Sequence, residues 1–171
     1  MNESPEIIAQ KNALRAEMRQ QLRAMTAEDR QSLSDEICER VLEMAQWAEA
    51  QNVILFSPLP GEPIITPLKL DCEARKVSAV VISHTARDES TLHLADTPNL
   101  ILVPGLAFSK ARHRLGRGGG FFDRLLAGRA AGAFKLGICF SFQLLDTIPS
   151  ETHDIVMDAV VTDELASASS R

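Results

Sequence analysis

Apolar residues gather along this chain in short continuous runs instead of alternating with polar ones. Continuous runs of this length are typical of strands that are buried on both faces, as in a parallel sheet. We therefore predict a weak strand at Thr91–Leu94 and five main strands, at Val53–Phe56, Val77–Ile82, Leu100–Val103, Leu136–Phe140 and Ala159–Val161.

Helical periodicity occupies the segments before and between these runs. Apolar residues three or four positions apart predict a helix over Ile7–Arg23. Thr26 is placed to cap a second helix, whose apolar stripe extends to Ala48, and Ile64–Arg75 predicts a short crossover helix that contains a proline. Strands that alternate with helices predict an α/β fold with a mostly parallel sheet covered on both faces.

Length and composition narrow the class of protein. The chain has 171 residues, enough for one sizeable core, so we expect residues 1–171 to form one domain. No apolar run approaches the ~20 residues of a membrane span and the N-terminus is polar, so we expect a cytoplasmic protein without a signal peptide or a membrane partner. A net charge of −5 argues against dedicated nucleic-acid binding. The histidines and cysteines lack metal-ligand spacing.

The most distinctive pattern is a strand followed by a basic, glycine-rich segment and the start of a helix at Phe121. Backbone N–H groups of glycines can approach phosphate oxygens closely, so this segment predicts a site for a polyanionic ligand. A flexible basic surface loop is the alternative. The spacing matches neither a Walker A loop nor the GxGxxG fingerprint. The positive residues are Lys110, Arg112, Arg114, Arg117 and Arg124, and the glycines are Gly116, Gly118, Gly119 and Gly120.

Two further features are candidates for ligand contacts. Lys11, Arg15, Arg19 and Arg23 recur every fourth residue and form one row on the first helix, which either faces solvent or brings its first members to a phosphate chain. The Pro- and Gly-rich turn at 57–63 follows a buried strand, a position where α/β proteins bind ligands, and Glu62 is its only charged residue.

These motifs resemble the 5-formyltetrahydrofolate cyclo-ligase family. The sequence LVPGLAFSKARHRLGRGGGFFDR at Leu102–Arg124 is similar to the central motif of that family. The resemblance includes Lys11–Arg15, Pro60-Gly61-Glu62 and the segment from Ile148 to Thr162, so it spans most of the chain in the expected order. It implies a three-layer α/β/α fold and an ATP- and Mg²⁺-dependent ligase of folate one-carbon metabolism.

In the reaction that the resemblance implies, ATP phosphorylates the formyl oxygen of 5-formyltetrahydrofolate. N10 then attacks the activated carbon, and loss of phosphate closes the ring of 5,10-methenyltetrahydrofolate. Phosphoryl transfer requires positioning and charge neutralisation, which arginines and backbone N–H groups supply.

The resemblance also implies a role for each residue of the motifs. Arg117 and Asp123 would be catalytic, and Asp123 and Asp154 would bind Mg²⁺, which needs only one or two carboxylates. The folate would contact Ser57, Glu62, Arg117, Gly118, Gly119, Gly120 and Phe121. The ATP would contact Lys11, Asn12, Ala13, Leu14, Arg15, Arg114, Leu115, Gly116, Arg117, Gly118, Gly119, Gly120, Phe121 and Phe122.

The sequence departs from the family pattern in three places. Phe121-Phe122 replaces a Tyr-Tyr pair, Ser109 replaces an aspartate, and the region between Val77 and Asn99 is short. These changes favour, as an alternative, a divergent nucleotide-binding paralogue that acts on another small substrate or has no turnover. An RNA-binding protein is a third hypothesis. With the leading hypothesis we expect a folate as the small-molecule partner and a monomer or weak dimer.

Overall fold

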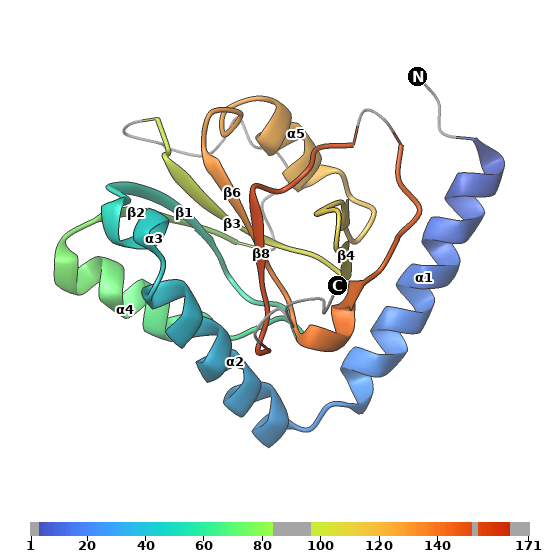
Figure 1. Ribbon diagram of the computed structural model, residues 1–171, viewed down its shortest axis with the longest axis horizontal. Coiled ribbons are helices and arrows are strands. Elements are labelled where there is room, and N and C mark those ends of the chain that lie inside the picture. The colour runs from blue at the N-terminus through green and yellow to red at the C-terminus, as the bar shows by residue number, and fades with distance from the viewer. Residues whose placement is uncertain (1–3, 84–96, 152–153, 165–171) are drawn as a thin grey trace, which may run out of the picture.

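Five parallel strands form the central sheet of the computed structural model, which describes residues 4–83, 97–151 and 154–164 (Figure 1). The strand predicted at Thr91–Leu94 lies outside the described residues. Because every pair of neighbouring strands is parallel, the predicted sheet type is confirmed. In spatial order the strands are β2 (Ser78–Ile82), β1 (Asn52–Phe56), β3 (Leu100–Pro104), β6 (Phe134–Ile138) and β8 (Ala159–Val161).

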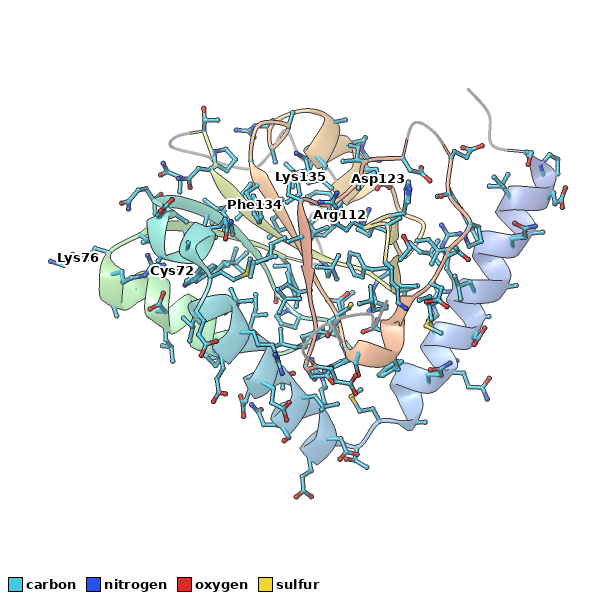
Figure 2. The ribbon with its side chains drawn as sticks, in the orientation of Figure 1. Cys72, Lys76, Arg112, Asp123, Phe134 and Lys135 are labelled. Carbon is cyan, nitrogen blue, oxygen red and sulfur yellow. The ribbon has the colours of Figure 1, made fainter. Side chains whose placement is uncertain are left out.

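Helices cover both faces of this sheet, so the expected α/β/α arrangement is confirmed. Along β3, Leu100 and Leu102 pack in one core cluster with residues of α2 (Ala27–Leu42), α3 (Ala45–Glu49) and α4 (Thr66–Arg75). The intervening Ile101 and Val103 pack in a second cluster with residues of α5 (Phe121–Ala127). Figure 2 shows the resulting separation of Cys72, on α4, from Asp123, on α5.

The first helix, α1 (Pro5–Ala24), lies at one side of the molecule, on the side of β4 (Figure 1). Met18 and Leu22 are buried and join the first core cluster, and Ser4 caps the helix by accepting a hydrogen bond from the Ile7 N–H. Within the described part of the chain, no helix has the length and apolar character needed to cross a bilayer.

A second, small sheet was not predicted from the sequence. It pairs β4 (Ala107–Ser109) with the antiparallel strand β5 (Arg114–Leu115) and the parallel strand β7 (Leu144–Leu145), which follows the short 3-10 helix η2 (Ser141–Gln143). Buried Gln143 donates hydrogen bonds to the carbonyl oxygens of Gly105 and Leu106, at 3.1 and 2.9 Å. The basic segment that precedes the glycines is therefore anchored as a hairpin.

Several predicted boundaries were wrong. The second helix does not continue to Ala48: it ends at Leu42, and Met44 adopts an extended conformation before α3 begins. The fourth strand spans Phe134–Ile138 and not Leu136–Phe140, because its parallel pairing with β3 begins at Phe134 and ends at Ile138. Helix α4 accommodates Pro67 in its first turn, where a missing N–H costs no helical hydrogen bond.

Candidate functional site

A pocket of about 420 Å³ opens at the carboxyl ends of β1, β2 and β3. The chain passes from β1 to β2 on one side and then places β3 on the other side of β1, so the pocket lies at a topological switch point. Phe56, Ser57, Leu59, Glu62, Ile82, Ser83, Pro104, Gly105, Arg114, Gly116, Arg117, Gly118, Gly119, Gly120, Phe121, Phe122, Asp123 and Arg124 line it.

The pocket gathers most of the residues that the sequence nominated. These are Ser57, Glu62, Arg114, Gly116, Arg117, Gly118, Gly119, Gly120, Phe121, Phe122 and Asp123. The other seven nominated residues lie outside this lining: Lys11, Asn12, Ala13, Leu14, Arg15, Leu115 and Asp154.

Six residues of the lining were not nominated as site residues from the sequence: Phe56, Leu59, Ile82, Ser83, Pro104 and Gly105. Arg124, which also lines the pocket, was named only as one of the positive residues of the basic segment. Five of the six lie at or directly after the carboxyl ends of parallel strands. Their position in the predicted strands was therefore a usable signal, because ligands of open α/β sheets bind at those ends.

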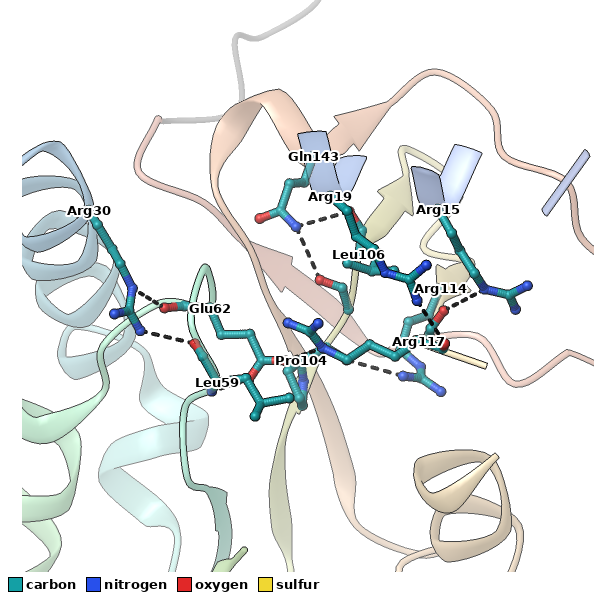
Figure 3. A network of polar contacts seen from close by, with 12 residues as sticks. Arg15, Arg19, Arg30, Leu59, Glu62, Pro104, Leu106, Arg114, Arg117 and Gln143 are labelled. Carbon is teal, nitrogen blue, oxygen red and sulfur yellow. Dashed lines mark hydrogen bonds and ion pairs between the residues drawn. The ribbon is translucent and has the colours of Figure 1, made fainter. Parts of the chain in front are cut away.

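The glycine loop turns its carbonyl oxygens toward arginines. Nε of Arg15 donates to the carbonyl oxygen of Gly116 at 3.0 Å, and a guanidinium N–H of Arg19 donates to that of Arg117 at 3.2 Å (Figure 3). In a trans peptide the N–H points away from the C=O, so the N–H groups of Arg117 and Gly118 point away from α1.

The loop has backbone amides available for a ligand. Within the described part of the chain, the backbone N–H groups of Gly118 and Gly119 donate no hydrogen bond. Gly118 and Gly120 have φ values of +101° and +68°, which other residues adopt only with strain. The loop conformation therefore requires glycine and presents N–H donors, as an anion-binding loop does.

Two arginines contribute positive charge to the walls of the pocket. Arg114 donates to the carbonyl oxygen of Pro104 at 3.1 Å, pairs with Asp123 and lies 5.7 Å from the centre of the Phe122 ring. Its side chain is only 6% exposed, so the contacts hold it in place. Arg117 pairs through Nε with Glu62 at 2.8 Å.

Glu62 is the buried carboxylate of the pocket, with 5% of its surface exposed. It accepts a hydrogen bond from the Leu59 N–H at 2.9 Å in addition to the ion pair with Arg117. A buried carboxylate needs such partners because its desolvation is costly. The ion pair also joins the two walls, since Glu62 lies in the turn after β1 and Arg117 in the glycine loop (Figure 3).

The cationic row of α1 faces the site and the C-terminal segment. Lys11 is buried and pairs with Asp154 at 3.3 Å, so the interpretation of the row as a solvated face is wrong for this residue. Asn12 accepts a hydrogen bond from Arg15. Ala13 is exposed, and Leu14 is partly buried against the core.

The two proposed magnesium ligands have different surroundings. Asp123 lines the pocket and its side chain is 66% exposed, so its oxygens can reach a ligand-bound cation. Asp154 lies outside the lining and accepts hydrogen bonds from Lys11 and from the Glu151 N–H. Among the described residues, no cluster of three or more His, Cys, Asp or Glu side chains could hold a metal ion.

Comparison with known proteins identifies the family of the chain. The profile of the 5-formyltetrahydrofolate cyclo-ligase family matches residues 7–92 and 74–163, which together cover most of the chain. The chain belongs to this family. A Schizosaccharomyces pombe protein named "Probable 5-formyltetrahydrofolate cyclo-ligase" is 28% identical over 194 aligned residues, covering 90% of this chain and 95% of the relative.

Solved structures share the fold of the cyclo-ligase family member described here. A 5,10-methenyltetrahydrofolate synthetase from Mycoplasma pneumoniae superposes with a TM-score of 0.76 at 23% identity, covering 90% of this chain and 99% of that one. The Aquifex aeolicus 5,10-methenyltetrahydrofolate synthetase gives a TM-score of 0.75 at 24% identity, covering 91% and 90%. At these identities the structural likeness supports the fold.

Proposed function

We propose that this protein is an ATP-dependent ligase that converts 5-formyltetrahydrofolate to 5,10-methenyltetrahydrofolate, with release of ADP and phosphate. Membership of the cyclo-ligase family supports the reaction. The observation that carries the assignment to this pocket is its pair of walls: a glycine loop with available N–H donors on one side and the buried carboxylate Glu62 on the other. A phosphate chain fits the first wall and N–H groups of a pterin fit the second.

Each wall has a task in the reaction. The N–H groups of Gly118 and Gly119, with Arg114 and Arg117, would hold the triphosphate and neutralise the charge that moves with the γ-phosphoryl group. Phe121 and Phe122 line the pocket as an edge-to-face pair 5.6 Å apart and would supply apolar contact to the folate. The reaction then needs no protein nucleophile, because the formyl oxygen receives the phosphoryl group and N10 displaces phosphate.

Asp123 suits magnesium better than Asp154 does. Its exposed carboxylate faces the pocket, and Mg²⁺ usually takes one or two carboxylates together with substrate phosphates. A bound Mg²⁺ would neutralise charge on the ATP phosphates. Asp154 would have to exchange Lys11 for the ion, so we assign it first to holding that buried lysine.

The proposal extends to the organisation of the molecule. We propose that residues 1–171 act as a single cyclo-ligase domain, as a cytoplasmic monomer or weak dimer, with a folate and no nucleic acid as its partner.

A spectroscopic assay tests the function. Purified protein with ATP, Mg²⁺ and 5-formyltetrahydrofolate should form the methenyl chromophore. Asp123→Asn should reduce the rate by about 100-fold or more, as expected for loss of charge that stabilises the transition state. The control is Asp146→Asn, which removes an exposed carboxylate paired with Lys110 outside the pocket lining and should leave the rate unchanged.

Two results would contradict the proposal. ATP binding without methenyl product would favour a paralogue with another substrate, and salt-sensitive RNA binding without ATP affinity would favour the nucleic-acid hypothesis. A fully active Asp123→Asn variant would leave the reaction in place and remove Asp123 from it.

A further inference from the structure

The turn that carries Glu62 determines where its carboxylate points. The Glu62 N–H donates to the carbonyl oxygen of Leu59 at 2.9 Å, and the Glu62 side chain accepts from the Leu59 N–H at 2.9 Å. Gly61, with φ +86°, occupies the position of this turn that favours glycine. Because the carboxylate bonds back to its own turn, any tilt of the turn moves the carboxylate with it.

Helix α2 presents a row of polar side chains to this turn and the residues that follow it. Arg30, Ser34 and Cys38 are four positions apart and therefore share one side of the helix. Ser34 accepts a hydrogen bond from the Ile64 N–H at 2.9 Å, and the Cys38 thiol donates to the Ile64 carbonyl oxygen at 3.4 Å. The row thus fixes the end of the segment at 59–64 to α2.

Arg30 fixes the beginning of the same segment. Its Nε donates to the carbonyl oxygen of Glu62 at 2.8 Å, and its Nη2 donates to that of Leu59 at 3.1 Å (Figure 3). One planar guanidinium therefore spans both ends of the turn, which the single ammonium group of a lysine cannot reproduce with the same geometry. Arg30 is not part of the pocket lining, so it can act on a ligand only through the turn.

We propose that Arg30 is a positioning residue of the folate half of the site, which sets the direction of the Glu62 carboxylate through the two ends of its turn. The inference rests on the proposed function, because it requires Glu62 to contact the folate. Displacement of a ligand-binding group by about 1 Å is enough to weaken its contact strongly. The glycine loop contacts α1 instead of α2 and reaches the turn of Glu62 through Arg117, so ATP binding should depend on Arg30 less than folate binding does.

Arg40 offers a matched control on the same helix. Its Nε and Nη2 donate to the carbonyl oxygen of Asp163 at 3.1 and 2.7 Å, so it also makes two guanidinium bonds to backbone. Like Arg30, it is half-buried, but neither Arg40 nor Asp163 lines the pocket. Arg30→Met and Arg40→Met therefore remove equivalent interactions, and only one of them supports the turn of Glu62.

The test measures KM and kcat of both variants in the methenyl assay, together with their melting temperatures. We expect Arg30→Met to raise the KM for 5-formyltetrahydrofolate about tenfold, with kcat and the KM for ATP within about twofold of wild type. Arg40→Met should lower the melting temperature by about as much as Arg30→Met does. It should change neither the KM for 5-formyltetrahydrofolate nor the KM for ATP. Arg30→Lys, which keeps a donor, should give an intermediate folate KM and provides the measurement if Arg30→Met does not fold.

The remaining outcomes separate this inference from the function on which it rests. An active wild type with an unshifted folate KM in Arg30→Met overturns the positioning role alone. Equal rises of both KM values in Arg30→Met and Arg40→Met also overturn it, because they show a general loss of structure. A wild type that forms no methenyl product overturns the proposed function and this inference together.

Discussion

The three cysteines of the chain are buried and have raised thiol pKa values. Cys38, Cys72 and Cys139 are each 1% exposed or less. Burial, with a smaller contribution from Asp35, raises the pKa of Cys38 to about 12, and burial is also the main cause of the raised pKa values of Cys72 and Cys139. At neutral pH the thiolate, which is the reactive form, is therefore scarce at all three positions.

This chemistry predicts both thiol reactivity and alkaline stability. At about pH 8 a thiol reagent should leave the folded protein unmodified and label three thiols per chain after denaturation. Between about pH 9 and pH 10 the unfolded chain releases the Cys38 proton while the folded chain retains it, so the free energy of unfolding should fall as pH rises. Denaturant titrations of wild type and Cys38→Ala measure this slope.

The slope for Cys38→Ala should be flatter than that of wild type, because Ala cannot titrate. Rapid labelling of any cysteine in the folded protein would contradict the burial of these thiols. An identical slope in wild type and Cys38→Ala would assign the alkaline loss of stability to other groups.

At the scale of the element, helix α1 holds the glycine loop through hydrogen bonds from two of its arginines. Arg15 and Arg19, one turn apart, bind consecutive carbonyl oxygens of the loop at Gly116 and Arg117. These contacts connect segments about a hundred residues apart in sequence. The orientation of the loop amides therefore depends on a helix that lies outside the pocket.

We predict that Arg15→Met raises the KM for ATP about tenfold, because the loop loses a charge-assisted hydrogen bond and the site loses nearby positive charge. Arg23→Met is the control, since Arg23 belongs to the same row but lies two turns further along and is exposed. It should leave the KM for ATP unchanged. Equal effects of the two substitutions would show that the row acts through general electrostatics and not through the loop.

The main elements could be predicted from the sequence because local pattern decides them. The apolar run at Leu100–Val103 has no alternative to a buried strand, and Thr26 caps α2 by accepting a hydrogen bond from the Asp29 N–H as its sequence position indicates. The glycine loop could also be recognised from its composition.

Other features could not be predicted, because long-range contacts decide them. The short strands β4 and β5 carry no periodicity, and they exist because Gln143 and β7 hold the hairpin from a distant part of the chain. In the sequence Lys11 is one member of an ordinary cationic row, and only the fold brings Asp154 beside it. The role of Arg30 was hidden in the same way, since its acceptors lie in the turn at 59–62.

At the scale of the whole molecule, the order of the strands creates the site. The chain places β2 on one side of β1 and β3 on the other, which leaves space at the carboxyl ends of β1 and β3. The loops after these strands supply Glu62 and the glycines. Helix α1 holds the glycine loop, and helix α2 holds the turn of Glu62. Two different helices thus hold the two walls, and the ion pair between Arg117 and Glu62 joins them.

The central claim is that the glycine loop binds the phosphates of ATP through its backbone N–H groups. The most direct measurement is the amide NMR spectrum of the protein during titration with a non-hydrolysable ATP analogue and Mg²⁺. We expect the amide signals of Gly118 and Gly119 to shift strongly, while that of Gly132, outside the pocket lining, stays in place. Unchanged Gly118 and Gly119 signals at saturation with the analogue would contradict the account.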